Sequence, residues 1–240
     1  MALTSAYTAA MRRTHTAVVT LASGLIAVTG CKSGPDAQTT NPWFAATYAY
    51  NDQGFTAAST SGADINQPNS DNNTPLHEAV NLDNVKAVQY FIGHGANLEA
   101  MDEDKETPLH FAATGGKTAA GRALIEGGAN VNARDEDGRT PLMTTVEDGY
   151  VDLTRALLAA KADPNIQDKD GRTALHFAAE AGQGELVRML LDAGANQSIL
   201  DKKGKTPLMI AMEDKQIAAV QALQGTPMQP TATQPVNPLQ

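Results

Sequence analysis

Three histidines are the side chains best suited to acid–base catalysis or metal binding, because imidazole titrates near neutral pH. His77, His110 and His176 each follow a Thr-Pro-Leu or Thr-Ala-Leu motif. Two further copies of the motif carry Met143 and Met209 at the same position. An active site needs one particular histidine beside a partner group, and a periodic histidine does not supply it. The pattern therefore predicts a structural role for all three.

Acidic turns at 102–104, 135–137 and 168–170 could bind calcium. An EF-hand loop needs acidic ligands at positions 1, 3 and 5, Gly at position 6 and Glu at position 12. Aligning the second turn on its glycine puts Ala133 at position 1 and Thr144 at position 12. The spacing fails, so we interpret the turns as solvated loop tips, with weak ion binding as the alternative. We predict no metal site.

Motifs of the common enzyme classes are missing from the sequence, which has no G-x-S-x-G, phosphate-binding loop, H-E-x-x-H or paired catalytic carboxylates. We therefore predict that the chain is not an enzyme and has no cofactor. A formal net charge of −9 argues against a nucleic-acid-binding protein. The single cysteine, Cys31, allows neither an internal disulfide nor a cysteine-rich zinc site.

The length fits one domain, or one domain with tails. The chain has 240 residues, of which 42% are hydrophobic and only 5% aromatic, so its core must consist of Ala, Leu, Val and Ile.

The first thirty residues have the pattern of an export signal. They contain no Asp or Glu, and Arg12 and Arg13 precede an apolar stretch at 17–28. This stretch is shorter than the roughly 20 residues of a membrane-spanning helix. A basic start, a short apolar middle and small residues at the end are typical of a secretory signal peptide.

The end of this segment, Val28-Thr29-Gly30-Cys31, resembles the lipobox of bacterial lipoproteins. The resemblance implies cleavage before Cys31, lipidation of its thiol, and a periplasm-facing position in the bacterial cell envelope. Lys32, where Asp would favour retention at the inner membrane, slightly favours the outer membrane. The mature chain would have 16 basic and 27 acidic residues, a net charge of −11. An anionic bilayer does not attract such a chain, so the lipid must be the anchor.

A period of 33 residues organises the rest of the chain. The motifs TPLHEAV, TPLHFAA, TPLMTTV, TALHFAA and TPLMIAM begin at residues 74, 107, 140, 173 and 206. A second signature keeps the same step at 62–64, 95–97, 128–130, 161–163 and 194–196, usually as Gly-Ala-Asn or Gly-Ala-Asp. This pattern resembles the ankyrin repeat over about 71–225.

The resemblance implies an all-α repeat fold, an ankyrin-repeat solenoid of helix-turn-helix units with β-hairpin-like turns. Pro suits the first turn of the first helix, and the preceding Thr can cap it. The second helix should end at Gly in the left-handed conformation. Lys161 replaces that glycine in one copy, which predicts a local weak point. Segments such as 132–139 predict extended arms around an Asp-Gly turn.

These patterns divide the chain into a signal peptide, a tether, six repeat units and a tail. We predict a degenerate N-terminal capping repeat whose 41–61 stretch is alternatively a loose packing segment, a C-terminal cap carrying Lys215, Gln216, Gln221 and Gln224, and a proline-containing disordered tail. The bounds, in this order, are 1–30, 31–40, 41–70, 71–103, 104–136, 137–169, 170–202, 203–225 and 226–240.

The ankyrin resemblance also implies a concave groove, formed by the turn tips and the exposed face of each first helix, that binds a protein partner. Its charges run from acidic to basic, and Phe111 and Phe177 are candidate aromatic anchors. Alternatively the tips only confer solubility and the two rings pack between helices. The candidate contacts are Glu103, Asp104, Glu106, Phe111, Glu136, Asp137, Arg139, Arg172, Phe177, Lys203 and Lys205.

The sequence thus favours a non-enzymatic, lipid-anchored and monomeric protein that holds an unidentified protein partner at the envelope. Narrower alternatives are a periplasmic immunity or inhibitor lipoprotein that neutralises a toxin or hydrolase, and an envelope scaffold. If Cys31 is an incidental thiol, the chain is instead a cytoplasmic ankyrin adaptor.

Overall fold

The computed structural model describes residues 19–21, 24–26, 41–49 and 52–225. Cys31, the tether and the tail lie outside these residues, so the lipidation stays a prediction. Within the predicted signal, strands β1 (Val19–Leu21) and β2 (Gly24–Ile26) form an antiparallel pair. No helix in the described part of the chain is both long and apolar enough to cross a membrane.

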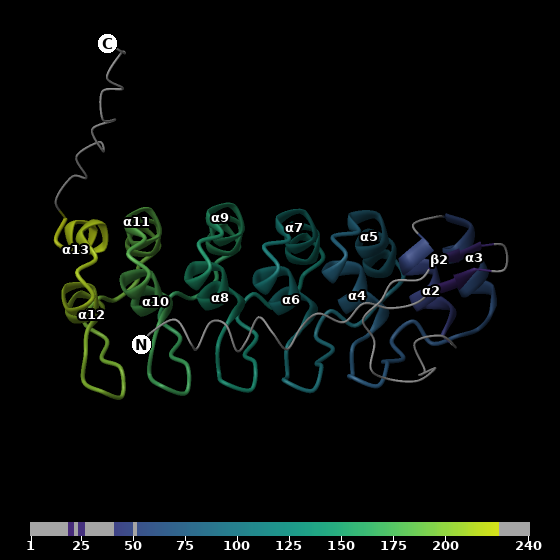
Figure 1. Cartoon of the computed structure of the whole chain (residues 1–240), viewed down its shortest axis with the longest axis horizontal. Coiled ribbons are helices and arrows are strands. Elements are labelled where there is room, and N and C mark those ends of the chain that lie inside the picture. The colour runs from purple at the N-terminus through teal and green to yellow at the C-terminus, as the bar shows by residue number, and fades with distance from the viewer. Residues whose placement is uncertain (1–18, 22–23, 27–40, 50–51, 226–240) are drawn as a thin grey trace, which may run out of the picture.

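From residue 42 onward the described residues form helix pairs that repeat every 33 residues (Figure 1). The first helices of the pairs are α2 (Pro42–Ala49), α4 (Pro75–Asn81), α6 (Pro108–Thr114), α8 (Pro141–Glu147), α10 (Ala174–Glu180) and α12 (Pro207–Glu213). The second helices are α3 (Asp52–Thr60), α5 (Val85–Gly93), α7 (Thr118–Glu126), α9 (Val151–Ala159), α11 (Gly184–Asp192) and α13 (Ile217–Leu223).

Figure 1 shows α4, α6, α8, α10 and α12 in one row, with a loop projecting below each, and the second helices in a row above. Each first helix contacts its own second helix and the first helix of the next repeat. The predicted all-α repeat solenoid is confirmed for the repeats.

The first helices from α4 onward each begin at a short motif. The threonine that begins each motif is extended, as Thr140 is at φ −103° and ψ 160°. In four of the five copies a proline follows, whose missing N–H costs nothing in the first turn of a helix, and in α10 the residue is Ala174. The hydroxyl of Thr140 accepts the backbone N–H of Met143 at 3.4 Å. With only seven residues, such a helix is too short to be stable alone, so packing against neighbours must hold it.

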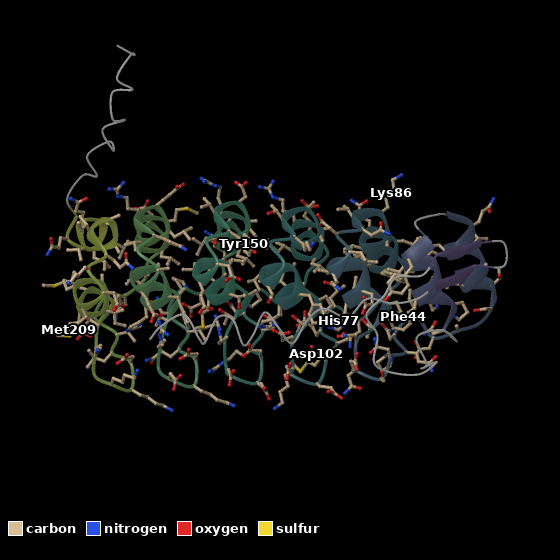
Figure 2. All side chains as sticks on the ribbon, in the orientation of Figure 1. Phe44, His77, Lys86, Asp102, Tyr150 and Met209 are labelled. Atoms are coloured by element: carbon tan, nitrogen blue, oxygen red, sulfur yellow. The ribbon has the colours of Figure 1, made fainter. Side chains whose placement is uncertain are left out.

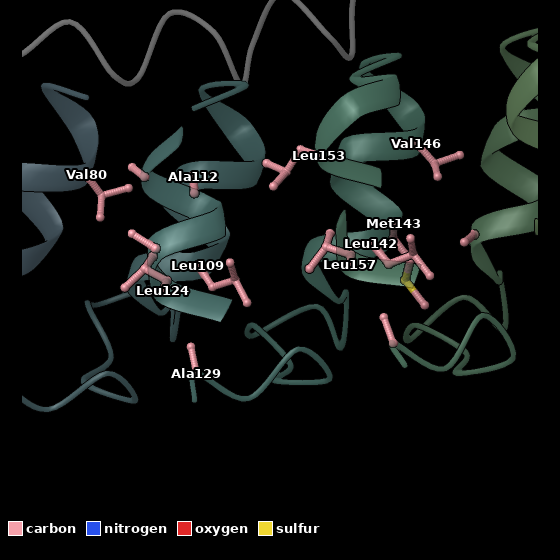
Figure 3. Close-up of a cluster of buried hydrophobic side chains, with 14 of the residues drawn as sticks. Val80, Leu109, Ala112, Leu124, Ala129, Leu142, Met143, Val146, Leu153 and Leu157 are labelled. Atoms are coloured by element: carbon pink, nitrogen blue, oxygen red, sulfur yellow. The ribbon is translucent and has the colours of Figure 1, made fainter. Parts of the chain in front are cut away.

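That packing comes from aliphatic side chains at repeat positions (Figure 3). Leu109 and Leu142 are 1% exposed, and Ala112 is fully buried between neighbouring helices. From the second helices, Leu124 and Leu157 are fully buried too. Alanine lets the helices approach closely while leucine supplies the buried area. One continuous core therefore runs the length of the solenoid. It consists mainly of aliphatic side chains, as the low aromatic content predicts.

The N-terminal pair α2–α3 keeps the register of the other repeats and carries an unusual number of aromatic rings. Trp43 packs on Phe91 with ring centroids 5.8 Å apart, and Phe55 packs on Tyr90 at 4.7 Å. The indole N–H of Trp43 donates to the carbonyl of Ala63 at 2.9 Å. Aromatic packing on α5 thus compensates for the poor helix-forming sequence of α3.

Three left-handed backbone positions recur in each repeat from residue 71 onward, whereas the sequence signature predicted only one. The predicted one ends the second helix and includes Gly95, at φ 77°, and Lys161, at φ 66°. The second follows the first helix and is occupied by Gly149 in one copy but by Asp83 in another. The third lies in the loop tip. Side chains with a Cβ occupy these positions five times in the described residues, at Asn72, Asp83, Lys105, Lys161 and Lys215.

Replacing Lys161 with glycine is expected to raise the free energy of unfolding by about 1 kcal/mol, because a left-handed conformation costs an L-residue with a Cβ roughly that much. Urea unfolding of the purified protein would measure the gain. Lys161→Ala removes the same charge but keeps the Cβ, and should show no such gain. Equal stabilisation by both substitutions would mean that charge, not backbone strain, makes this position weak.

The loop tips are tight turns, and the expected extended arms are not strands in the described residues. At one tip the N–H of Asp135 donates to the carbonyl of Arg139, and the N–H of Gly138 donates back to the carbonyl of Asp135. Neighbouring tips are joined by single backbone bonds, such as Glu136 N–H to the Asp104 carbonyl at 2.9 Å. One bond per repeat is too few to build a sheet ladder.

Candidate functional site

The three motif histidines hold the repeats together. His77 Nδ1 accepts the backbone N–H of Thr74 at 3.0 Å, and Nε2 lies 3.2 Å from the carbonyl oxygen of Glu106 in the next repeat. Because Nδ1 accepts a hydrogen bond, Nε2 of the neutral ring must carry the hydrogen and donate it to the carbonyl. His110 and His176 make the same contacts to the carbonyls of Arg139 and Lys205. In these contacts the three histidines have the structural role that the sequence predicts.

Burial keeps these imidazoles neutral. Desolvation lowers the pKa of His77 to about 4, although its hydrogen bond to the Glu106 carbonyl acts in the opposite direction. Desolvation also lowers the pKa of His110 and of His176. A neutral ring with both nitrogens bonded to backbone has no proton or lone pair left for a substrate or metal.

The first aspartate of each tip is also structural. Asp135 Oδ1 accepts the backbone N–H groups of Asp137 and Arg139 at 2.9 and 2.8 Å. Asp102 and Asp168 close their turns in the same way. Desolvation raises the pKa of Asp102 to about 6. These carboxylates organise the tip and direct the residues after them into solvent.

The exposed tip residues form one charged row. Glu103, Asp104, Glu136 and Asp137 are exposed at two neighbouring tips, and Lys203 is exposed at the last. Backbone bonds from Lys169 to Asp137 and from Lys202 to Asp170, both 2.8 Å, continue the connection between tips. The structure thus brings these predicted contacts together on one side and preserves their acidic-to-basic order.

The basic residues on the helix side of the tips are paired within their own repeats. Arg139 pairs with Glu147, and Arg172 pairs with Glu180. Lys205 pairs with Glu213, and this contact raises the lysine pKa. Our sequence prediction missed this pairing, which a basic and an acidic residue eight apart in three successive copies would have signalled. The cationic part of the predicted gradient therefore lies mainly at the lysine-bearing tip.

Phe177 lies buried, which corrects its prediction as an exposed anchor. It is 4% exposed because two guanidinium groups cover its ring, with the Cζ atoms of Arg139 and Arg172 at 4.8 and 4.1 Å from the ring centroid. The packing alternative therefore holds for this ring. A partner approaching here would meet the two arginines first.

Phe111 has no such cover and is only half-buried. The repeat positions that hold the two arginines around Phe177 hold Asn73 and Glu106 around Phe111. Its ring packs edge-on against His77, with centroids 4.9 Å apart. Of the two phenylalanines, Phe111 is therefore the one that a partner can reach.

Glu106 is the second correction among the candidate contacts, since it is only 7% exposed. Its backbone accepts from His77 and donates to Asp102, so the residue is drawn into the junction between two repeats. We call the remaining surface the tip-and-helix face. It consists of Glu103, Asp104, Phe111, Glu136, Asp137, Arg139, Arg172, Lys203 and Lys205.

Comparison with known proteins agrees with the repeat geometry. The family model for ankyrin repeats matches three times, at residues 42–135, 83–168 and 142–233. Together these matches span most of the 240 residues, and the first begins at the start of α2. No curated protein matches the sequence. With its 33-residue helix pairs and bonded loop tips, the chain belongs to the ankyrin-repeat family.

Proposed function

We propose that this chain is a non-enzymatic protein that is anchored by lipid at Cys31 and binds a protein partner at the bacterial cell envelope. Ankyrin repeats form protein–protein interaction modules, and the family is generally non-enzymatic. The proposal goes further in naming the anchor, the location and the surface. One observation supports the surface above all: the bonded tips present charged side chains in a row beside the accessible ring of Phe111.

The charges of this row indicate the kind of partner. The acidic tips with Glu103, Asp104, Glu136 and Asp137 suit a basic patch, and the tip with Lys203 suits an acidic one. Complementary charges steer association and fix orientation. Salt screens the attraction between charges of the exposed tips and charges of a partner. Binding should therefore weaken as ionic strength rises.

The tip contacts are tested by charge reversal. The double variant Glu103→Lys, Glu136→Lys is expected to recover the wild-type partner from an envelope fraction at a tenth of the yield or less. Both side chains are exposed, so folding should be unaffected, which circular dichroism would verify. Glu126→Lys, an exposed position at the end of the second helix α7, is the matched control and should bind normally. Equal yields from all three proteins would contradict the proposed surface.

The anchor has its own test. Cys31→Ala is expected to abolish acyl labelling and to move the protein from the membrane fraction to the soluble fraction. Cys31→Ser, which keeps a similar size and polarity but lacks the thiol, should behave identically. Labelling and fractionation unchanged by either substitution would end the lipoprotein proposal and favour a cytoplasmic adaptor, without affecting the binding surface.

A further inference from the structure

In the last described repeat, apolar side chains of α12 are exposed to solvent. In α12, Met209 is 50% exposed and Met212 is 59% exposed. The same positions in earlier repeats face the next repeat and are closed: His77 is fully buried, as is Val146. Figure 2 shows Met209 at the end of the solenoid. These methionines therefore occupy stacking positions for which the described residues supply no covering repeat.

Two more large hydrophobic side chains near this end of the solenoid are exposed. Ile217, the first residue of α13, is 71% exposed, and Leu200, in the loop before α12, is 51% exposed. Leu200 occupies the repeat position of Arg134 and Gln167, whose side chains donate to a carbonyl of the following repeat at 2.8 and 3.1 Å. Leu200 thus also stands where a following repeat would contact it. We call Leu200, Met209, Met212 and Ile217 the C-terminal end face.

The predicted polar cap covers this end only in part. Gln216, assigned to the cap, instead donates from its side chain to the carbonyl of Glu180 in the preceding repeat, at 2.9 Å. At the opposite end of the solenoid the large side chains Trp43, Phe44 and Phe55 are all buried. In the described residues, apolar side chains are thus exposed at the C-terminal end of the solenoid, whereas these large side chains at its N-terminal end are buried.

The size of the patch favours a short segment over a second folded protein. Four partly exposed aliphatic side chains present on the order of a few hundred Å². A stable protein–protein interface buries about 800 Å² on each partner. A tethered segment needs less area, because the tether gives it an effective concentration of roughly millimolar.

A suitable segment follows directly. Residues 226–240 begin just after α13, one of the two helices that form the face, and contain no Asp, Glu, Lys or Arg. They include the apolar residues Met228, Val236 and Leu239 and four prolines. Fifteen residues reach at most about 50 Å, enough to cross the ends of two helices about 10 Å wide. Proline-containing segments bind apolar surfaces without forming helix or strand.

We propose that residues 226–240 fold back over the C-terminal end face and serve as the missing cap of the solenoid. This assigns the segment a structural role in place of the expected disordered tail. Its apolar side chains shield Met209 and Met212 from water, and the absence of charged side chains leaves no side-chain ion to desolvate.

Methionine oxidation by dilute hydrogen peroxide tests the proposal in the purified full chain. Met101, 50% exposed in a loop before α6, is the internal reference, since Met209 has the same exposure in the described residues. We expect Met209 and Met212 to oxidise at least threefold more slowly than Met101. Replacing 226–240 by a Gly/Ser segment of equal length should bring the three rates within twofold of one another.

The reciprocal variant tests the same contact from the other side. Met209→Lys, Met212→Lys places two charges on the end face at exposed positions and should release the segment, so that Met228 oxidises at least threefold faster than in wild type. Equal rates for Met101, Met209 and Met212 in the full chain would overturn the proposal. So would protection that persists in the Gly/Ser variant and rises with protein concentration, which would assign the face to a second copy of the chain.

Discussion

A chain with alanine in place of Phe177 is expected to lose about 3–5 kcal/mol of its free energy of unfolding, the usual cost of truncating a buried phenylalanine. The ring is 4% exposed and lies beneath the guanidinium groups of Arg139 and Arg172. Truncation would leave a cavity inside the solenoid. It would also remove two cation–π contacts, each worth about 0.5–1 kcal/mol or more. Urea unfolding monitored by circular dichroism measures the loss.

Phe111→Ala is the matched control, because it makes the same chemical change at the same repeat position. Phe111 is half-buried and has no arginine above it, so we expect a loss of only about 1–2 kcal/mol. Phe177→Leu, which keeps most of the volume, should fall between wild type and Phe177→Ala. Equal losses from the two alanine variants would show that the arginine cover contributes nothing and that the two rings are equivalent.

This difference decides how the binding surface can be probed. A variant lacking both rings would lose partner binding if it lost its fold, whatever the partner contacts. Phe111→Ala alone keeps the repeat containing Phe177 intact, so lost binding in that variant reports on the surface. The exposed tip glutamates, Glu103 and Glu136, provide a second and independent probe.

The sequence predicted the repeat geometry because each part of it depends on local residues. The threonine–proline start of the first helix, the aliphatic stripe and the glycine after the second helix recur at fixed spacing, and each has a local physical cause. Lys161 adopts the left-handed conformation that its place in this pattern predicts.

Side-chain exposure could not be predicted in this way, since it depends on residues one repeat away. Phe111 and Phe177 lie at the same position of two similar motifs, TPLHFAA and TALHFAA, but different residues stand 5 and 38 positions before them. Glu106 was expected at the surface because glutamate is usually exposed, yet it lies in the junction between two repeats. The exposure of the C-terminal end face could not be predicted for a similar reason: Met209 and Met212 stand at ordinary stacking positions, but the described residues place no repeat over them.

Acid is expected to destabilise the protein through its motif histidines. The pKa of His77 is about 4 in the folded protein against 6.5 for an ordinary histidine. Between these values the unfolded chain binds a proton that the folded chain does not, so the free energy of unfolding falls as the pH falls from 6.5 towards 4. Above pH 6.5 both states are neutral and the stability is fully present. From pH 7.5 to 5, His77 alone accounts for a loss of about 2 kcal/mol.

Comparing variants isolates this contribution from that of the carboxylates. Asp102, whose pKa is raised to about 6 by desolvation, acts in the opposite sense, because its folded form takes up a proton first as the pH falls. His77→Met, a substitution already present as Met143 two repeats later, removes the histidine and leaves Asp102 in place. The variant should lose about 2 kcal/mol less than wild type between pH 7.5 and 5 in urea unfolding, whatever its stability at neutral pH.

The reciprocal substitution provides the control. Met143 is 1% exposed, so Met143→His places a fourth histidine at a buried stacking position and should steepen the loss of stability in acid. A pH dependence that His77→Met leaves unchanged would mean that the acid sensitivity arises elsewhere, in the carboxylates of the tips. A change in opposite directions for the two variants would show that the residue at this stacking position sets how the junctions between repeats respond to acid.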